Sequence, residues 1–394
     1  MNIENIAFEE INNVFLQNLL DNQVQEGKTI EYKEYLTISS DSEKKEFLAD
    51  ISSFSNSSGG LIIFGIKEDK GIPIELLGLE IIDIDMEIQR IENIIRDGIE
   101  PRIWGISIKT IIINESRRVI VIKIPKSWAL PHMVSFSGQS KFYSRNSIGK
   151  YPLDVSEIRN LFSQSSTLSD QINNFRLERL STIVSDDTPI PLEEGAKLVV
   201  HLIPFVSFSP NVNVNLIDFG LKPPNPIYSS GYNGRFNFDG FLSFCNTSDN
   251  RKACSYIEFF RNGKIEAVNT SLLRQRDGKK YIPSEAFERE LIDCVNSYLQ
   301  LQKQKNIEPP IALFVSLLNV SGYEMAVDPR RSFYEEPRPI EKKDLLVDGV
   351  LIEDFDCEAS QLLKPIIDSI WNATGWPQSM NYNENGDWIF QSKI

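Results

Sequence analysis

The first 165 residues alternate between two hydrophobic patterns. Apolar residues spaced three or four apart predict helices, and apolar runs or strict apolar–polar alternation predict strands. The predicted helices cover 2–22, 40–57, 83–99 and 154–162. The predicted strands cover 29–36, 61–69, 106–114, 117–125 and 141–147. The runs 106–114 and 117–125, joined through Asn114 and Glu115, form a predicted antiparallel hairpin.

A polar, serine-rich segment, "SQSSTLSDQ", follows Phe162 and is typical of a domain boundary. We therefore expect two domains, 1–165 and 166–394. The second domain has predicted helices at 171–184, 284–305 and 357–371, and β-rich runs at 196–205, 235–245, 254–268 and 311–320. A β-turn is expected at Asn262–Gly263. The predicted class is α+β in both domains, with mostly antiparallel strand pairing.

Composition places the chain among ordinary globular proteins. With 394 residues, 41% of them hydrophobic, it can bury a sizeable core and is long enough for two domains or three small ones. We find no signal-peptide pattern and no apolar run long enough to span a membrane, so we expect a cytoplasmic protein. A zinc site is not expected, because the four cysteines include no CxxC pair and the chain has only two histidines. His132 is expected to be structural or exposed, with a role as a proton shuttle as the alternative.

The charge is unevenly distributed. The net charge is −14, yet residues 101–150 contain nine basic residues against one acid, a local charge of +8 that leaves −22 for the rest. Two interpretations stay open: a surface that binds a polyanion, or a solvated hairpin face. The candidate nucleic-acid contacts are Arg117, Arg118, Lys123, Lys126, Lys141, Tyr143 and Arg145. For Arg145, a pairing at the strand edge is the alternative to clamping a phosphate beside Tyr143.

The stretch "EGKTIEYKEY" at 26–35 carries the candidate chemistry. In a strand, Glu31 and Lys33 share one face. A carboxylate and a lysine in this arrangement serve metal-dependent phosphodiester cleavage, in which the acid holds Mg²⁺ or Mn²⁺. Further ligands are expected from Glu26, and from Glu68 or Asp69 at the end of the 61–69 strand. The alternative is an exposed salt bridge.

The combination of E-x4-E-Y-K at 26–33, "SSFSNSSGGLIIFGIKEDKG" at 52–71, "IPKSWALPH" at 124–132 and "FYSRNS" at 142–147 resembles the Schlafen-type AlbA-like domain over about 165 residues. The RNA-cleaving members of this family use three acids in their nuclease site. The resemblance implies that Glu26, Glu31 and Glu68 take these positions here, with Lys33 in support. In this chain Asp69 lies beside Glu68, so the third acid is one of these two. The Schlafen nuclease core pairs two such lobes, and the one lobe here implies a homodimer.

We therefore expect a nucleic-acid-binding protein that prefers RNA to DNA and cleaves tRNA or other structured RNA with Mg²⁺ or Mn²⁺. The resemblance suggests a role in defence or stress. The alternative is a non-catalytic binding or regulatory module whose second domain recognises a protein partner or drives oligomerisation. An ATP-binding sensor is least favoured, because no GxxxxGK[ST] occurs and "SSGG" precedes a strand.

Overall fold

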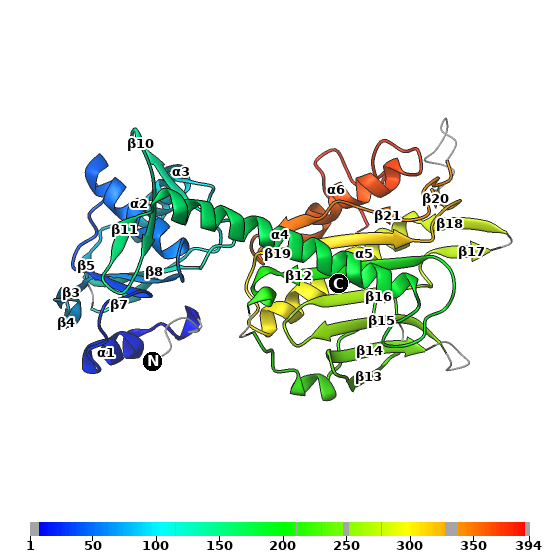
Figure 1. Cartoon of the computed structure of the whole chain (residues 1–394), viewed down its shortest axis with the longest axis horizontal. Helices are drawn as coiled ribbons and strands as arrows, with labels where there is room; N and C mark the ends of the chain where they lie inside the picture. The colour runs from blue at the N-terminus through cyan, green and yellow to red at the C-terminus, as the bar shows by residue number, and fades with distance from the viewer. Residues whose placement is uncertain are drawn as a thin grey trace. The chain divides into compact units, whose positions relative to one another are not determined.

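The computed structural model describes residues 8–114, 116–209, 212–229, 231–246, 252–276, 278–327 and 338–390. The chain divides into two units, Met1–Ser169 and Asp170–Ile394 (Figure 1). Both units combine helices with mainly antiparallel strands, which confirms the α+β class. Within the described residues, none of the helices has the length and apolar character needed to cross a membrane.

The first unit builds its core around one mixed sheet. Its helices are η2 (Phe8–Glu10), α1 (Asn13–Asp21), α2 (Asp41–Ser55), α3 (Ile84–Gly98) and the first half of α4 (Val155–Val184). Its strands are β1 (Ile30–Lys33), β2 (Gly60–Phe64), β3 (Ile66–Asp69), β4 (Ile72–Leu76), β5 (Leu79–Glu80), β6 (Ile99–Glu100), β7 (Ser107–Ile112), β8 (Arg117–Ile124), β9 (Met133–Phe136), β10 (Gln139–Arg145) and β11 (Lys150–Pro152). The main sheet has the order β1-β2-β8-β5, with β7 also on β8, and a second sheet has the order β11-β10-β9-β6.

Alternating side chains divide the core of this unit into two layers. On β2, Leu61 and Ile63 pack with α1, whereas Ile62 and Phe64 pack with α2 and α3. Both faces of the main sheet are therefore covered by helices (Figure 1). Strand β1 pairs with β2 in parallel and lies at the edge of the sheet. On its outer side, Ile30 O accepts from Gly27 N, and Tyr32 N donates to the Glu26 carboxylate.

Local sequence signals account for several elements as predicted. Ser40 and Glu43 form a capping box at the start of α2, and Asp83 caps α3. The hairpin of 106–114 and 117–125 is confirmed as the antiparallel pair β7–β8. Its connecting residue Glu115 lies outside the described residues. The helix predicted over 2–22 is shorter, because the Asn12 side chain caps a new helix at α1; residues 1–7 lie outside the described residues.

The single strand predicted over 61–69 is wrong. It ends at Phe64, and the chain turns at Gly65, whose φ of +101° is in the region that favours glycine. A Cβ there would lie 3.0 Å from Gly78 Cα. Residues 66–69 instead form β3, which pairs with β4 as a separate hairpin. Glu68 and Asp69 therefore lie on this hairpin and not at the end of the buried strand.

The two helices predicted around a polar linker are one continuous helix, α4. The serine-rich segment contains no Gly or Pro to interrupt the backbone. Ser163 donates to Arg159 O, and both Ser166 and Thr167 donate to Ser163 O, so their hydroxyls are satisfied within the helix. The division between the units, after Ser169, falls inside α4 and not in a loop.

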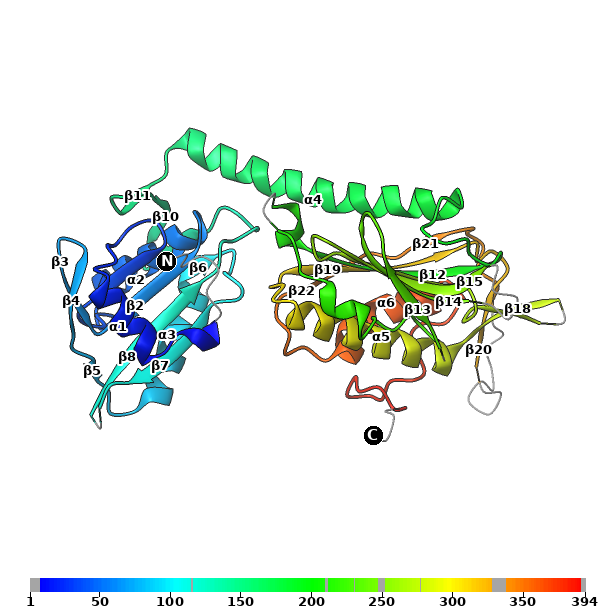
Figure 2. The same cartoon turned by 90° about the horizontal axis from the view of Figure 1, so that it is seen from below.

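The second unit is a large antiparallel sheet between helices. Its helices are the second half of α4, η3 (Phe205–Phe208), η4 (Ile217–Gly220), α5 (Ser284–Gln304) and α6 (Ala359–Asn372). Its strands are β12 (Lys197–Pro204), β13 (Asn233–Phe236), β14 (Gly240–Asn246), β15 (Ala253–Phe260), β16 (Ile265–Asn269), β17 (Arg274–Arg276), β18 (Lys279–Pro283), β19 (Ile311–Leu318), β20 (Glu324–Ala326), β21 (Leu345–Leu346) and β22 (Val350–Ile352). The sheet order is β13-β14-β15-β16-β12-β19-β21, with β22 also on β19. Figure 2 shows the second half of α4 on one side of this sheet and α5 and α6 on the other.

A buried carboxylate fixes α4 on this sheet. Both Glu266 oxygens accept hydrogen bonds from Arg179 of α4, at 2.7 and 2.9 Å. Tyr256 also donates to Glu266 at 2.8 Å, and His201 Nε2 lies 3.0 Å from it. The carboxylate is fully buried, and its partners compensate the loss of water.

The neighbouring Glu258 generates a prediction about pH. Burial raises the pKa of Glu258 to about 7, helped by the charge of Glu266. An ordinary glutamate titrates at 4.5, so the folded chain binds an extra proton between these values. The free energy of unfolding should therefore decrease as pH rises from about 4.5 to 7, by up to about 3 kcal/mol. Glu258→Gln should remove this decrease.

Thermal and urea unfolding of the full chain across pH 4.5–8 measures the effect. Glu324→Gln, a change at an exposed glutamate of the same unit, is the control and should retain the decrease. Identical pH profiles for Glu258→Gln and the unmodified chain would contradict this assignment.

Candidate functional site

Glu31, on the edge strand β1, is held by two cations. Its Oε1 lies 2.5 Å from Lys33 Nζ, and its Oε2 lies 2.8 Å from Arg145 Nη2. The side chain of Glu31 is 13% exposed, compared with 36% for Lys33. The predicted pairing of Glu31 with Lys33 is therefore present, but it is a partly buried pair with a third member.

Asp50 of α2 extends this arrangement and was not identified from the sequence. It lies 3.6 Å from Lys33 Nζ and 2.6 Å from Lys150 Nζ, and Lys150 also contacts Glu46 at 2.5 Å. Its sequence signal is an acid inside the apolar stretch "FLADISSF" of a predicted helix. The ionic network, as we call this set, alternates in sign and consists of Arg145, Glu31, Lys33, Asp50, Lys150 and Glu46.

Arg145 reaches Glu31 from β10 of the second sheet and is 4% exposed. Its guanidinium lies over the Phe54 ring of α2, 3.6 Å from the centroid, and donates to Gly27 O at 3.0 Å. Asn56 fastens β10 beside α2 by donating to Tyr143 O and His132 O, both at 2.8 Å. Nη2 of Arg145 is consequently committed to internal partners, whereas Nε and Nη1 are buried without a hydrogen-bond partner among the described residues. Because the whole guanidinium is buried, the geometry supports the strand-edge alternative over a phosphate clamp.

The charges in the ionic network shift the pKa values of its members. Burial acts to raise the pKa of Glu31, but Lys33 and Arg145 outweigh it and bring this pKa below its usual range. Burial acts to lower the pKa of Lys33, but Asp50 and Glu31 raise it overall. Burial, with the charge of Glu31, raises the pKa of Asp50. Lys33 therefore remains a cation at neutral pH.

Glu26 and Glu68 meet at the turn of the β3–β4 hairpin. Glu26 Oε1 accepts from Tyr32 N at 2.7 Å, and Glu26 N donates to Gly71 O at 2.7 Å. Glu68 Oε2 accepts from Gly71 N at 2.5 Å, and Asp69 is exposed on β3. Burial raises the pKa of Glu26, and the nearby Glu31 and Glu68 add to the increase. The three predicted acids thus lie within electrostatic reach of one another.

These acids do not fit a divalent cation in this arrangement. Across the described ranges, no group of three or more His, Cys, Asp or Glu side chains has a geometry that could hold a metal ion. Both Glu31 oxygens already contact Lys33 and Arg145, and one oxygen each of Glu26 and Glu68 accepts a backbone hydrogen bond. Mg²⁺ and Mn²⁺ prefer several free carboxylate or water oxygens.

The basic residues of 101–150 do not form one surface. Arg117 and Arg118 are consecutive on β8, so their side chains lie on opposite faces of the sheet. Arg117 donates to Glu80 at 2.9 Å, whereas Lys126, beyond the strand, lies over the Trp128 ring. The other two candidate lysines lie apart: Lys123 in the middle of the sheet on β8, and Lys141 exposed on β10.

Tyr143 and His132 both have internal partners. Tyr143 is half-buried against the α2–α3 layer, and its hydroxyl accepts from Gln139 at 2.7 Å. His132 is fully buried, with Nδ1 2.6 Å from Pro101 O and Nε2 2.5 Å from Ser127 Oγ. Burial lowers the pKa of His132, which keeps its ring neutral.

Tyr35, just after β1, was missed by the sequence analysis. It is 64% exposed, and the hydrogen bond and charge of Glu34 raise its pKa while Arg117 acts in the opposite direction. An exposed aromatic ring therefore follows β1, two residues after Lys33. The only sequence signal is an aromatic residue in the charged stretch "EYKEY".

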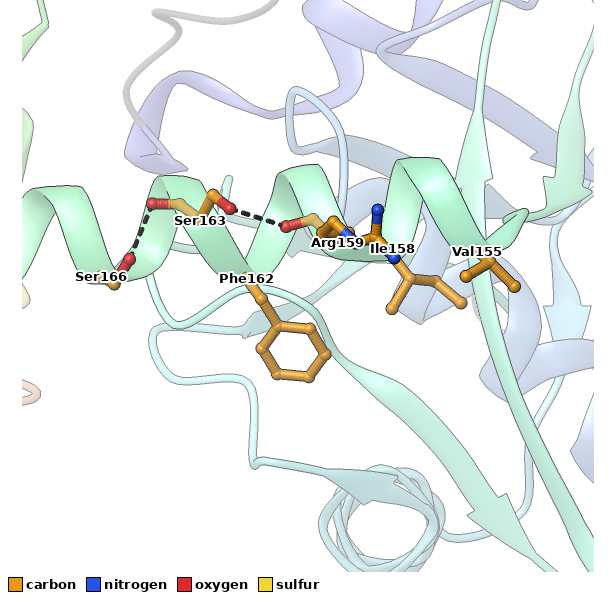
Figure 3. A pocket seen from close by; sticks show the side chains of 6 residues that line it. All are labelled: Val155, Ile158, Arg159, Phe162, Ser163 and Ser166. Carbon is orange, nitrogen blue, oxygen red and sulfur yellow. Dashed lines mark hydrogen bonds between the residues drawn. The ribbon is translucent and has the colours of Figure 1, made fainter.

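A separate hollow lies along the first half of α4 (Figure 3). All its lining residues come from this helix: Val155, Ile158, Arg159, Phe162, Ser163 and Ser166. None belongs to the ionic network or to the Tyr35 region.

Residues 26–154 match the model of the family described as Schlafen, AlbA_2. No curated protein matches the chain. Similar solved structures include the DIP2311 protein from Corynebacterium diphtheriae, with 18% identity over 35% of this chain and 26% of that one, and a TM-score of 0.25. The chain thus spans about a quarter of that protein. The N-terminal domain of a RecG-related protein from Nitrosomonas europaea has 20% identity over 33% of this chain and 86% of that one, and a TM-score of 0.26.

The Glu31 contacts generate a stability prediction. Glu31→Gln leaves Arg145 buried without its anion, so we expect a decrease in the free energy of unfolding of about 3 kcal/mol. Glu68→Gln, on the exposed hairpin, retains an acceptor for Gly71 N and should change it by less than about 0.5 kcal/mol. Urea unfolding of both variants at pH 7 makes the comparison, and equal small effects would show that the Glu31 pairs contribute no more than a surface salt bridge.

Proposed function

We propose that the first unit, whose residues 26–154 match the Schlafen, AlbA_2 family model, binds nucleic acid, and single-stranded or structured RNA in preference to DNA. The family match points to nucleic-acid binding as the coarse function. The preference for RNA comes from the resemblance to RNA-cleaving Schlafen proteins.

The observation that carries this proposal is the exposed ring of Tyr35, which lies two residues after the partly exposed Lys33 at the carboxyl end of β1. Aromatic rings beside cations are how proteins hold single-stranded nucleic acids, since any base can stack and any phosphate can pair. The end of β1 therefore provides one stacking surface and one phosphate contact.

Lys33 can contribute although Glu31 already contacts it. An ammonium group has three donors, and the pairs with Glu31 and Asp50 use at most two of them. Its side chain is 36% exposed, so the remaining donor can reach an outside phosphate. The carboxylates around it keep the ammonium charged, as the direction of its pKa shift indicates.

A metal-dependent endoribonuclease is the second candidate function, acting on tRNA or another structured RNA in defence or stress. Two observations favour it: the resemblance, and the closeness of Glu26 and Glu68 to Glu31. The hydrogen bonds of these acids weigh against it, so we place the binding module first. The homodimer that one AlbA-like lobe implies stays a prediction.

The binding proposal predicts a difference between two cations on opposite faces of the main sheet. Lys33 points toward α2, where it contacts Asp50, whereas Arg117 lies on the face of β8 whose residues pack with α1. Lys33→Met should weaken binding of a single-stranded RNA and reduce the slope of log affinity against log salt by about one unit. Tyr35→Ala should weaken it by about 1–3 kcal/mol without changing the slope. Arg117→Ala removes the same charge from the opposite face and should leave both quantities unchanged. Fluorescence anisotropy across salt concentrations provides the measurement, and equal losses for Lys33→Met and Arg117→Ala would refute the assigned face.

A cleavage assay separates the two candidate functions. Purified protein is incubated with total tRNA in Mg²⁺, in Mn²⁺ and in EDTA, and RNA binding is measured in parallel. The binding module predicts intact tRNA in all three conditions together with retained binding. Cleavage that requires a metal and disappears in Glu31→Gln, with folding verified by circular dichroism, would replace it by the endoribonuclease.

A further inference from the structure

We propose that a cavity between the last turns of α3 and the segment 102–108 holds one nucleotide, with its base against Trp104 and its phosphate at Arg102. The choice of ligand class rests on the proposed function. The cavity is distinct from the Tyr35 region, because its lining comes only from residues 92–108.

The walls of the cavity suit a flat apolar ring. Its volume is about 230 Å³, and aliphatic side chains, among them Ile95 and Ile106, form much of its surface. Trp104 completes the lining and is 41% exposed, which is unusual for the largest apolar side chain. Its ring therefore offers a stacking face beside an aliphatic wall.

The backbone keeps Trp104 in this position. Gly105 follows it with a φ of +74°, and a Cβ at Gly105 would lie 3.5 Å from the Pro125 ring. The turn thus depends on glycine for its backbone conformation. Ile103 and Ile106, on either side, pack against the α2–α3 core layer and anchor the segment.

Arg102 supplies the anion contact. It is exposed, and within the ranges that the structure covers it forms no hydrogen-bonded ion pair. Arg96, the other guanidinium of the lining, already donates to Asp97 at 3.0 Å. The planar donors of Arg102 are thus available for a phosphate.

The local charge limits the ligand to one phosphate. Arg96 and Arg102 are opposed by Glu92 in the lining and by Asp97, whose pKa is lowered by the hydrogen bond from Arg96 and further by Arg102. A nearly neutral rim suits a single phosphate group and disfavours a triphosphate. The volume lies below the roughly 300–1,000 Å³ of pockets for drug-sized ligands, which fits one base with its sugar outside.

The test titrates the full chain with the four nucleoside 5′-monophosphates and the corresponding uncharged nucleosides, by calorimetry. The Trp104 indole resonance, assigned by its loss in Trp104→Phe, locates the site. Trp104→Ala should weaken monophosphate binding roughly five- to hundred-fold, the range for loss of one stacked base. Arg102→Gln, an exposed change that preserves folding, should weaken the monophosphates but not the nucleosides.

Tyr35→Ala is the matched control, because it should weaken RNA and leave monophosphate binding unchanged. If the wild type binds RNA but no monophosphate at millimolar concentration, this inference is overturned while the proposed function stands. If it binds monophosphates but no RNA, the cavity assignment is supported and the proposed function fails. Binding of N-acetyltyrosinamide at Trp104 as tight as that of the monophosphates would also overturn it, in favour of an aromatic peptide.

Discussion

The ion pair between Glu31 and Arg145 is the constraint on which the first unit depends. Glu31 lies on the edge strand of the main sheet and Arg145 on a strand of the second sheet, and the guanidinium between them lies over Phe54 of α2. Burying these charges is costly unless each is matched and hydrogen-bonded. One carboxylate therefore fixes the relative positions of three elements that contribute to different layers.

The same pair decides which chemistry the site offers. Lys33 and Arg145 occupy both oxygens of Glu31, so the residue best placed to ligate a cation is already neutralised by protein groups. In the same ionic network, Lys33 and Lys150 both contact Asp50, so protein groups also balance the charge of this acid. Groups able to contact an outside ligand then lie at the margin of this network, where Lys33 is partly exposed and Tyr35 is largely exposed. This is a physical reason to favour binding over cleavage.

Sequence patterns predicted elements whose signals are local. The capping box of α2 and the alternation in β7 and β8 depend on residues a few positions apart, and these elements were correctly placed. The turn at Gly65 and the unbroken α4 were missed, because a glycine in an apolar run and a serine-rich stretch each allow more than one backbone. Tertiary contacts decide between them.

The candidate site shows the same limit more sharply. The pairing of Glu31 with Lys33 follows from strand periodicity, whereas Arg145 is 114 positions away from Glu31 and no periodicity links them. Asp50 was not identified, because its partners Lys33 and Lys150 lie 17 and 100 positions away in the chain. Arg117 and Arg118 looked equivalent as charges, yet strand alternation places them on opposite faces. Charge counts identify candidate residues, but geometry assigns their partners.

Buried acids of the second unit follow the same physical rule with a different result. Glu288 of α5 accepts from the indoles of Trp371 and Trp388 and from Ser379, at 2.7, 2.9 and 2.7 Å, and so connects α5 to α6 and to the segment after it. Glu266 is saturated by Arg179 and its neighbours. Since internal donors occupy both carboxylates, these clusters act as structural anchors. In the first unit, by contrast, Lys33 contacts the partly buried Glu31 while its own side chain is 36% exposed, so a donor of this pair can still reach an outside ligand.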